Sequence, residues 1–251
     1  MPYYKKKIFI DQSIQSVLNQ TYKKFELLIV YDDIDKRELF YLKKFVDNDD
    51  RVKIIENEKN LGAGLSRNKG IEASKGKFIA FLDSDDLWSK SKLEKQIKFM
   101  TQNNCFISHT SYEIIDSQNI TVSKRVARDF NNFKSLLKSC DIGLSTVVID
   151  KKIITHDLRF PSIKTKEDFV LWLDILKKNY QIKGLSENLA KWRKTNNSLS
   201  SIVKYTDVLT ADEYRDVINN NGTQNQIDNL GDSNTNWQEE VYRKLYQTYL
   251  I

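Results

Sequence analysis

Apolar residues in the first hundred positions alternate between a helical spacing and short continuous runs. Residues 10–18 place isoleucine, valine and leucine on one face of an amphipathic helix, which we expect to end near Tyr22. Residues 25–30 then form a nearly continuous apolar run of strand length. Such runs are typical of strands that are buried on both faces of a parallel sheet.

The same alternation continues along the chain. Residues 35–47 and 65–73 have helical spacing, and residues 52–55 and 77–82 read as strands. Strands that alternate with helices indicate βαβ units, so the sequence predicts an α/β fold of the Rossmann-like kind, with a mostly parallel sheet flanked by helices. In such sheets, ligands bind beyond the carboxyl ends of the strands.

The pattern becomes less regular after residue 100. Residues 105–115 and 145–149 resemble strands, and residues 167–178 have the spacing of a strong helix. We find no internal repeat.

The composition changes again near residue 205. Residues 219–236 consist largely of small polar residues, as in a linker, and apolar residues at four-residue steps over 237–249 predict a final amphipathic helix. We therefore expect a main domain at 1–204 and an extension at 205–251, which holds eight acidic and three basic residues. The final helix needs a docking surface, and a homo-oligomer contact is one candidate.

Composition limits the class of protein. The chain has 251 residues, 40% of them hydrophobic, and a net charge of +6, which suits a folded domain with an appendage. This charge is too mild to indicate a nucleic-acid partner, but it is compatible with phosphate ligands or an anionic membrane surface. No apolar run is long enough to span a membrane, and the two cysteines favour a reducing compartment. We expect a cytoplasmic protein that can contact the inner membrane face peripherally.

Two predicted strands end in acidic residues. Asp83, Ser84 and Asp85 follow the strand at 77–82 and form a D-x-D arrangement. Carboxylates two positions apart can hold Mg²⁺ or Mn²⁺, which prefer oxygen ligands and leave sites open for phosphate. An isolated D-x-D is more often an acidic turn that caps a helix. Its place at the ligand-binding edge of the sheet favours the metal site.

Asp32 and Asp33 follow the strand at 25–30 in the same way. Alone they would be turn residues or helix-terminus acids; with the other acidic turn on the same edge, they suggest a shared site for a nucleoside and a diphosphate. Arg67 lies in a helix behind Gly62 and Gly64, without the third glycine of a dinucleotide-binding fingerprint. Its guanidinium could bind phosphate or pair with a neighbouring acid.

Together these motifs resemble family 2 glycosyltransferases of the GT-A fold. The resemblance is specific because five segments occur in the family's order and spacing, whereas any one of them would be weak. The matching segments are Pro2-Tyr3-Tyr4, residues 16–22, 25–33, 60–71 and 81–88, followed by Glu167-Asp168 and residues 192–200.

The resemblance implies inverting transfer of a single sugar from a nucleotide-diphosphate donor, with a UDP-sugar expected, to a hydroxyl of a glycan or lipid-linked acceptor in surface polysaccharide biosynthesis. Asp168 would be the general base. The nucleotide-binding positions would be Pro2, Tyr4, Asp32, Asp33, Arg67, Asp83 and Ser84, and the Mn²⁺ or Mg²⁺ ligands would be Asp85 and Asp83. Without the resemblance, Asp168 would be read as an acid that stabilises the start of a helix.

The chain departs from the family pattern at several positions, including Ile34-Asp35 in place of Gly-Ser and Thr195 or Asn196 in place of a His, and two further features affect the expected fold and activity. The family normally has a full apolar strand before the Pro-x-Tyr segment, and here one residue precedes Pro2, so we expect the sheet to lack most of this strand. The Gln-x-x-Arg-Trp signature of processive synthases is absent, which favours transfer of one sugar.

Two other functions stay open at this point. A strand followed by Asp-x-Asp also begins phosphatases that use an aspartate nucleophile, but that motif normally lies near the N-terminus. A nucleotide-sugar or membrane-surface binding module that has lost catalysis would agree with the short first strand.

Overall fold

The computed structural model describes residues 1–138, 141–155, 158–163 and 165–195. The predicted extension at 205–251, with its final helix, lies outside the described residues, and so does the motif end at 196–200. The division into two domains therefore stays a prediction.

The N-terminal half is a three-stranded parallel sheet in the order β1-β2-β3. Its strands are β1 (Pro2–Tyr3), β2 (Leu27–Tyr31) and β3 (Val52–Glu56), and the helices of this half are α1 (Lys7–Leu18), α2 (Arg37–Asn48) and α3 (Ala63–Ala73). β2 and β3 are each reached through a helix, as parallel pairing requires. The predicted alternation is confirmed here, although α1 ends four residues before Tyr22.

The second half is built on a six-stranded mixed sheet in the order β4-β8-β6-β9-β5, with β7 paired to β6. Its strands are β4 (Phe78–Ala80), β5 (Leu87–Trp88), β6 (Ile107–Ile115), β7 (Thr121–Arg125), β8 (Val148–Asp150) and β9 (Lys183–Arg193). Its helices are α4 (Lys92–Gln102), α5 (Phe133–Lys138) and α6 (Glu167–Lys177), with short turns η1 (Leu144–Thr146) and η2 (Lys151–Ile153).

Parallel pairing in this second sheet is confined to β6 and β9. The other pairs are antiparallel. A short connection, such as the one from Ile115 to Thr121, can join only antiparallel neighbours, whereas parallel strands need a crossover. The predicted strand at 145–149 begins instead as the 3-10 turn η1, and its strand part is β8.

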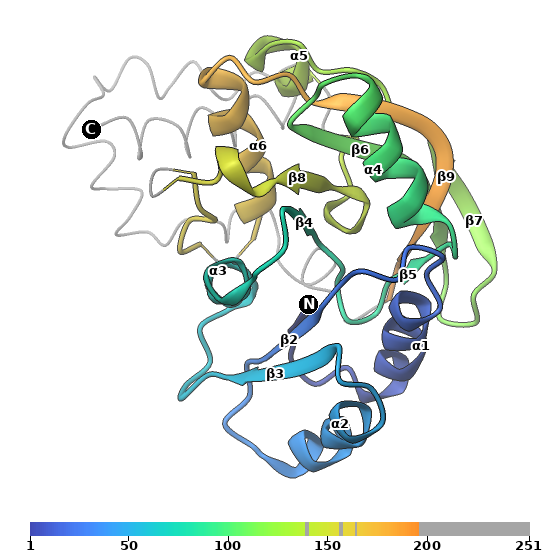
Figure 1. Cartoon of the computed structure of the whole chain (residues 1–251), viewed down its shortest axis with the longest axis vertical. Coiled ribbons are helices and arrows are strands. Elements are labelled where there is room, and N and C mark those ends of the chain that lie inside the picture. Colours follow the sequence, from blue (N-terminus) through green and yellow to red (C-terminus); the bar gives the residue numbers. More distant parts are fainter. Residues whose placement is uncertain (139–140, 156–157, 164, 196–251) are drawn as a thin grey trace, which may run out of the picture.

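The first strand, β1, has two residues and pairs with β2 in the first sheet, while β4 pairs with β8 in the second. Figure 1 shows the N-terminal end between β2 and β4. The Met1 ammonium group donates a hydrogen bond to the Leu28 carbonyl at 2.9 Å. Burial, with help from the nearby Arg67 charge, lowers the pKa of this amino group to about 5. Within the described chain, no strand pairs with both sheets.

Buried apolar side chains form two clusters that follow this division. One surrounds α6, where Trp172 is fully buried and packs with Phe81 and Phe160. The other surrounds β2 and includes Trp88 from the second half. In the part of the chain that the structure describes, no helix has both the length and the apolar character needed to cross a bilayer.

Candidate active site

The D-x-D turn lies between β4 and β5, and its backbone is held from several sides. The Asp86 N–H donates to the Asp83 carbonyl at 3.1 Å, which closes the turn. The Ser145 hydroxyl accepts from the Asp83 N–H at 3.0 Å and donates to the Asp86 carboxylate. The Arg193 N–H donates to the same carboxylate at 2.8 Å. These contacts give Asp86 a structural role, although burial, together with the charges of Asp85 and Asp83, raises its pKa well above the usual range.

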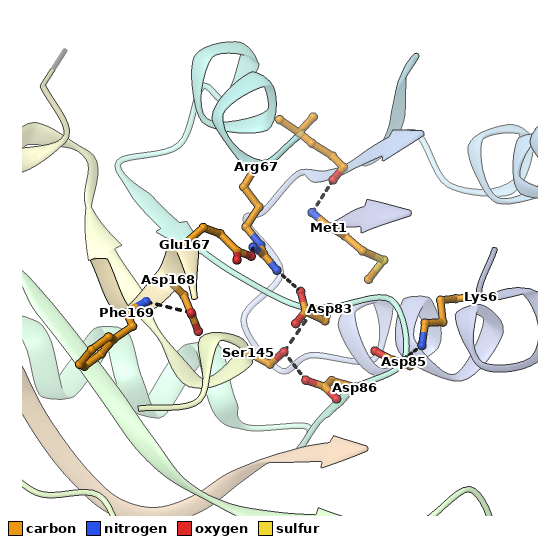
Figure 2. Close-up of polar contacts among 11 residues, drawn as sticks. Met1, Lys6, Arg67, Asp83, Asp85, Asp86, Ser145, Glu167, Asp168 and Phe169 are labelled. Carbon is orange, nitrogen blue, oxygen red and sulfur yellow. Dashed lines mark hydrogen bonds and ion pairs between the residues drawn. The ribbon is translucent and has the colours of Figure 1, made fainter. Parts of the chain in front are cut away.

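The two predicted metal ligands are half-buried, and each forms an ion pair (Figure 2). Oδ1 of Asp83 lies 2.7 Å from Arg67, and Oδ2 of Asp85 lies 2.7 Å from the Lys6 ammonium. Burial raises the pKa of Asp85, and the Lys6 charge works against this shift. The second oxygen of each carboxylate is not used by these two ion pairs.

Arg67 connects the D-x-D turn to α6. Its guanidinium is buried and pairs with both Asp83 and Glu167. Burial alone would lower the pKa of Arg67, but the two carboxylates raise it, so the group stays charged. Of the two roles open from the sequence, pairing with acids is therefore observed. The Nε–H is buried without a hydrogen-bond partner among the described residues, so one donor is left for a ligand or a water molecule.

Asp168 lies in the first turn of α6, next to Glu167. Its Oδ1 accepts a hydrogen bond from the Phe169 N–H at 2.8 Å, as expected of an acid at a helix N-terminus. Burial and the neighbouring Glu167 charge raise the pKa of Asp168 to about 6. A carboxylate with this pKa is a better match for proton transfer near neutral pH than an ordinary aspartate.

Asp32 is buried and almost saturated with fixed donors. Its Oδ1 accepts from the Asn57 amide and the Leu61 N–H, both at 2.7 Å, and its Oδ2 accepts from the Gly62 N–H at 2.8 Å. Asp32 therefore holds the loop that leads into α3. Neighbouring Asp33 accepts a hydrogen bond from the Asp35 N–H at 3.1 Å. Its carboxylate accepts fewer hydrogen bonds than that of Asp32.

Three further residues are predicted to bind the nucleotide: Pro2 and Tyr4 at β1, and Ser84 in the D-x-D turn. Pro2 pairs with Val30 in the parallel sheet, and Tyr4 follows β1 with 46% of its surface exposed. Ser84 is buried between Asp83 and Asp85. Their contact with a nucleotide stays a prediction.

Two glycines at the start of α3 have different roles. Gly62 precedes the first turn of α3 with φ +84°, a conformation that L side chains rarely adopt. A Cβ on Gly64 would lie 3.0 Å from the Pro161 carbonyl and 3.1 Å from the Cγ of Glu167. The small residue at Gly64 thus permits the approach that lets Arg67 reach Glu167.

The carboxylates of this turn suit a hard divalent cation. In the described ranges, no group of three or more His, Cys, Asp and Glu side chains could hold a metal ion unaided. Asp83 and Asp85 supply oxygen ligands that already attract cationic groups. Mg²⁺ commonly binds through one or two carboxylates and substrate phosphates, so the donor set fits such an ion when a diphosphate completes it.

Sequence reasoning missed three residues of this site. Lys6 could not be distinguished from its neighbours in a run of three lysines. Ser145 matched no motif, because a serine in an apolar segment is common. Arg193 was noted only within a matching segment. Its Nε–H donates to the Asp85 carbonyl at 2.8 Å, which fixes the backbone of the turn.

A fold of this kind, with acidic turns after two of its strands, is compatible with a glycosyltransferase, and the comparisons show this class. Residues 1–155 match the model for "Glycosyl transferase family 2". The chain belongs to this family, whose members are transferase enzymes.

Two curated relatives are similar over most of their length. TuaG of Bacillus subtilis (strain 168), a glycosyltransferase named for teichuronic acid biosynthesis, is 36% identical over 201 residues, which cover 80% of this chain and 79% of TuaG. WfgD of Escherichia coli, a UDP-Glc:alpha-D-GlcNAc-diphosphoundecaprenol beta-1,3-glucosyltransferase, is 41% identical over 203 residues, which cover 80% of this chain and 78% of WfgD.

A solved structure is also similar in fold. A fragment of S. aureus TarS in complex with UDP-GlcNAc has a TM-score of 0.68 and 19% identity, covering 98% of this chain and 71% of the fragment. The predicted GT-A-like α/β fold flanked by helices is confirmed. The expected mostly parallel sheet is instead mixed, because the pairs of the second sheet other than β6 with β9 are antiparallel.

Proposed function

We propose that this protein transfers a single sugar from a UDP-sugar to a hydroxyl of a lipid-linked glycan, with inversion and with the aid of Mn²⁺ or Mg²⁺. The observation that carries the proposal is the Asp83–Arg67–Glu167 bridge, which ties the D-x-D turn to the helix turn that holds Asp168. Donor-binding acids and a candidate base thereby belong to one rigid site.

The donor half of the site would hold the nucleotide. Pro2, Tyr4 and Asp33 would line the nucleoside pocket, and Asp32 would support it by holding the loop before α3. Asp83 and Ser84 would approach the ribose, and the unpartnered Nε–H of Arg67 offers one donor to the nucleotide. The UDP preference is supported by the donor in the name of WfgD and by the ligand bound to TarS.

Asp85 and Asp83 would hold the divalent cation against the donor diphosphate. When bound, the cation would neutralise the charge that gathers on the departing diphosphate without any proton transfer. The protein's contribution here is to fix the backbone that carries the two carboxylates, through Ser145 and Arg193.

Asp168 would remove the acceptor proton. The acceptor oxygen forms a bond to the anomeric carbon, the bond from that carbon to the β-phosphate oxygen breaks, and UDP leaves with the electron pair. The hydroxyl proton passes to the Asp168 carboxylate. A base on the side opposite the leaving group gives inversion, and a well-placed base contributes about 10²–10⁴-fold.

The acceptor is proposed to be a sugar on a lipid diphosphate, in surface polysaccharide biosynthesis, by analogy with the acceptor in the name of WfgD. Residues 1–204 hold 37 basic and 26 acidic residues, so this part of the chain is attracted to an anionic membrane face where such acceptors lie. Peripheral contact at the inner membrane face and a homo-oligomer through the C-terminal helix belong to the same proposal.

The test is turnover by the purified chain with UDP-glucose or UDP-GlcNAc, Mn²⁺ or Mg²⁺, and a short-chain lipid-diphosphate GlcNAc acceptor. We expect one product with one added sugar of inverted configuration. Asp85→Asn should lower turnover by at least about 100-fold, because the charge of the leaving group loses its partner. Asp174→Asn, on α6 outside the site, is the matched control.

Two results would redirect the assignment. UDP binding by calorimetry with no transfer or hydrolysis would favour a binding module. Phosphate release from small phosphomonoesters would favour the aspartate-nucleophile phosphatase, a reaction that family membership does not support. Turnover by Asp85→Asn at the wild-type rate would remove the metal role of Asp85.

A further inference from the structure

Lys6 neutralises one of the two proposed metal ligands. Its ammonium lies 2.7 Å from Oδ2 of Asp85, with 26% of the lysine side chain and 14% of the aspartate side chain exposed. Figure 2 shows Lys6 reaching from the start of α1 toward the D-x-D turn. A cation of the protein itself therefore occupies the position of a counter-ion on Asp85.

The local sequence gives no structural reason for a lysine at this position. Lys6 is the N-cap of α1, where Ser, Thr, Asp or Asn would satisfy free N–H groups, and its side chain makes no capping hydrogen bond. The first turn of α1 has no acidic residue, so Lys6 and Lys7 place positive charge at the positive end of the helix dipole.

The preceding residue is also strained. Lys5 has φ +49°, in the left-handed region that costs a non-glycine residue free energy. An unfavourable cap and a strained residue side by side are more typical of a functional position than of a purely structural one.

We propose that Lys6 is an exchangeable counter-ion of Asp85, which a divalent cation displaces when it binds and which then binds the donor diphosphate. This inference rests on the proposed metal role of Asp85. Lysine suits the exchange because its ammonium is a point charge on a flexible stem, unlike the rigid fork of arginine.

Charge and position indicate the donor diphosphate as the new partner of the released Lys6 ammonium. A cation on Asp83 and Asp85 would hold the phosphates next to the carboxylate that Lys6 leaves. The released ammonium would then have an anionic partner within reach of the same stem. Lys6 would thus weaken binding of the cation alone and strengthen binding of the nucleotide once the cation is present.

The test compares Lys6→Met with wild type by two titrations: Mn²⁺ alone, followed by electron paramagnetic resonance, and UDP at saturating Mn²⁺, followed by calorimetry. Loss of a half-buried ion pair should tighten Mn²⁺ binding about fivefold, and loss of the ammonium should weaken UDP binding by a similar factor. Lys7→Met is the control, because Lys7 is exposed and lies over the Tyr41 ring. It should change neither affinity by more than about twofold.

Opposite changes in the Mn²⁺ and UDP affinities exclude simple damage to the fold, which would weaken the binding of both ligands. Unchanged, weaker or undetectable Mn²⁺ binding by Lys6→Met overturns the exchange, and unchanged UDP affinity overturns the diphosphate role. Asp85→Asn separates this failure from failure of the proposed function. If Asp85→Asn binds Mn²⁺ like wild type, the metal site is wrong; if it loses Mn²⁺ while Lys6→Met gains nothing, only the inference about Lys6 is wrong.

Discussion

Asp32 after β2 and Asp85 in the turn after β4 both follow a strand, yet different groups compensate their charges. The carboxylate of Asp32 accepts hydrogen bonds from two backbone N–H groups and the Asn57 amide. The carboxylate of Asp85 faces the ammonium of Lys6. The donors to Asp32 are backbone groups and a buried amide, which the fold holds in place, whereas Lys6 is a partly exposed side chain on a flexible stem.

This difference separates two uses of acidic residues at one edge of an α/β fold. A carboxylate that is saturated by backbone donors stabilises a loop and has little left to offer a ligand. A half-buried carboxylate that is held by a side-chain cation can exchange that cation for another one. The sequence presents both as aspartates after a strand, so only their partners distinguish them.

Asp32 supports the D-x-D turn through α3. Asp32 holds Leu61 and Gly62, which lead into the first turn of α3. Arg67 lies one turn further along and reaches Asp83. The N-terminal half therefore positions a cation for the acids of the second half.

The largest effect is expected from Asp168, the acid that would react directly. Asp168→Asn should lower kcat by about 10²–10⁴-fold, because the amide cannot accept the acceptor proton. UDP affinity should stay unchanged, since Asp168 belongs to the acceptor side of the proposed site. Turnover assays and calorimetry measure the two quantities, with Asp174→Asn as the control on the same helix.

The pH dependence of Asp168 gives a second measurement. With a pKa of about 6, kcat should fall about tenfold per pH unit below that value, since the protonated acid is inactive as a base. Its folded pKa lies above its unfolded one, so its stabilising contribution is complete below pH about 4 and is lost as pH rises through about 6. Asp168→Asn should therefore be at least as stable as wild type at pH 7. A loss of stability there would contradict the raised pKa.

In contrast to Asp168→Asn, the substitution Asp32→Asn should lower the stability of the fold. Asp32→Asn replaces an acceptor with an amide that cannot serve all three donors, and a buried unpaired donor costs about 1–3 kcal/mol. The urea midpoint should fall, and transfer should weaken because α3 is less well fixed. Asp85→Asn is the comparison, with a stability change of under about 1 kcal/mol, since a half-buried ion pair contributes little. Equal stability losses in both variants would contradict the proposed distinction between Asp32, which holds a loop, and Asp85, which pairs with an exchangeable cation.

The sequence was a good guide to the strands and helices of the first half. There, apolar runs alternate with amphipathic helices, and each connection between strands contains a helix, which provides the crossover that parallel pairing needs. In the second half, β5 has two residues and β9 pairs with both β5 and β6. Such pairings depend on contacts far apart in the chain, which local periodicity does not record.

The candidate site shows the same limit. Asp83, Asp85 and Asp168 could be predicted because they lie in motifs that occur in the family's order. Their nucleotide, metal and base roles remain predictions. The sequence could not show that Arg67 pairs with Asp83 and Glu167, because those partners lie 16 and 100 positions away. It also could not show that Lys6, rather than its neighbours in the lysine run, faces Asp85.

The smallest effect tests how closely α3 must approach α6. Gly64→Ala places a Cβ 3.0 Å from the Pro161 carbonyl, a backbone atom that cannot move easily, so α3 must shift and Arg67 with it. We expect kcat to fall about threefold to tenfold, because small displacements of positioning groups are costly.

Gly70→Ala is the matched control on the same helix, since its Cβ would lie 3.4 Å from a side-chain methyl of Val30. Both variants gain helix propensity of up to about 1 kcal/mol, so only the local contact differs between them. If both variants keep wild-type kcat, the approach of α3 to α6 contributes to stability alone, and the link between the two halves does not depend on its spacing.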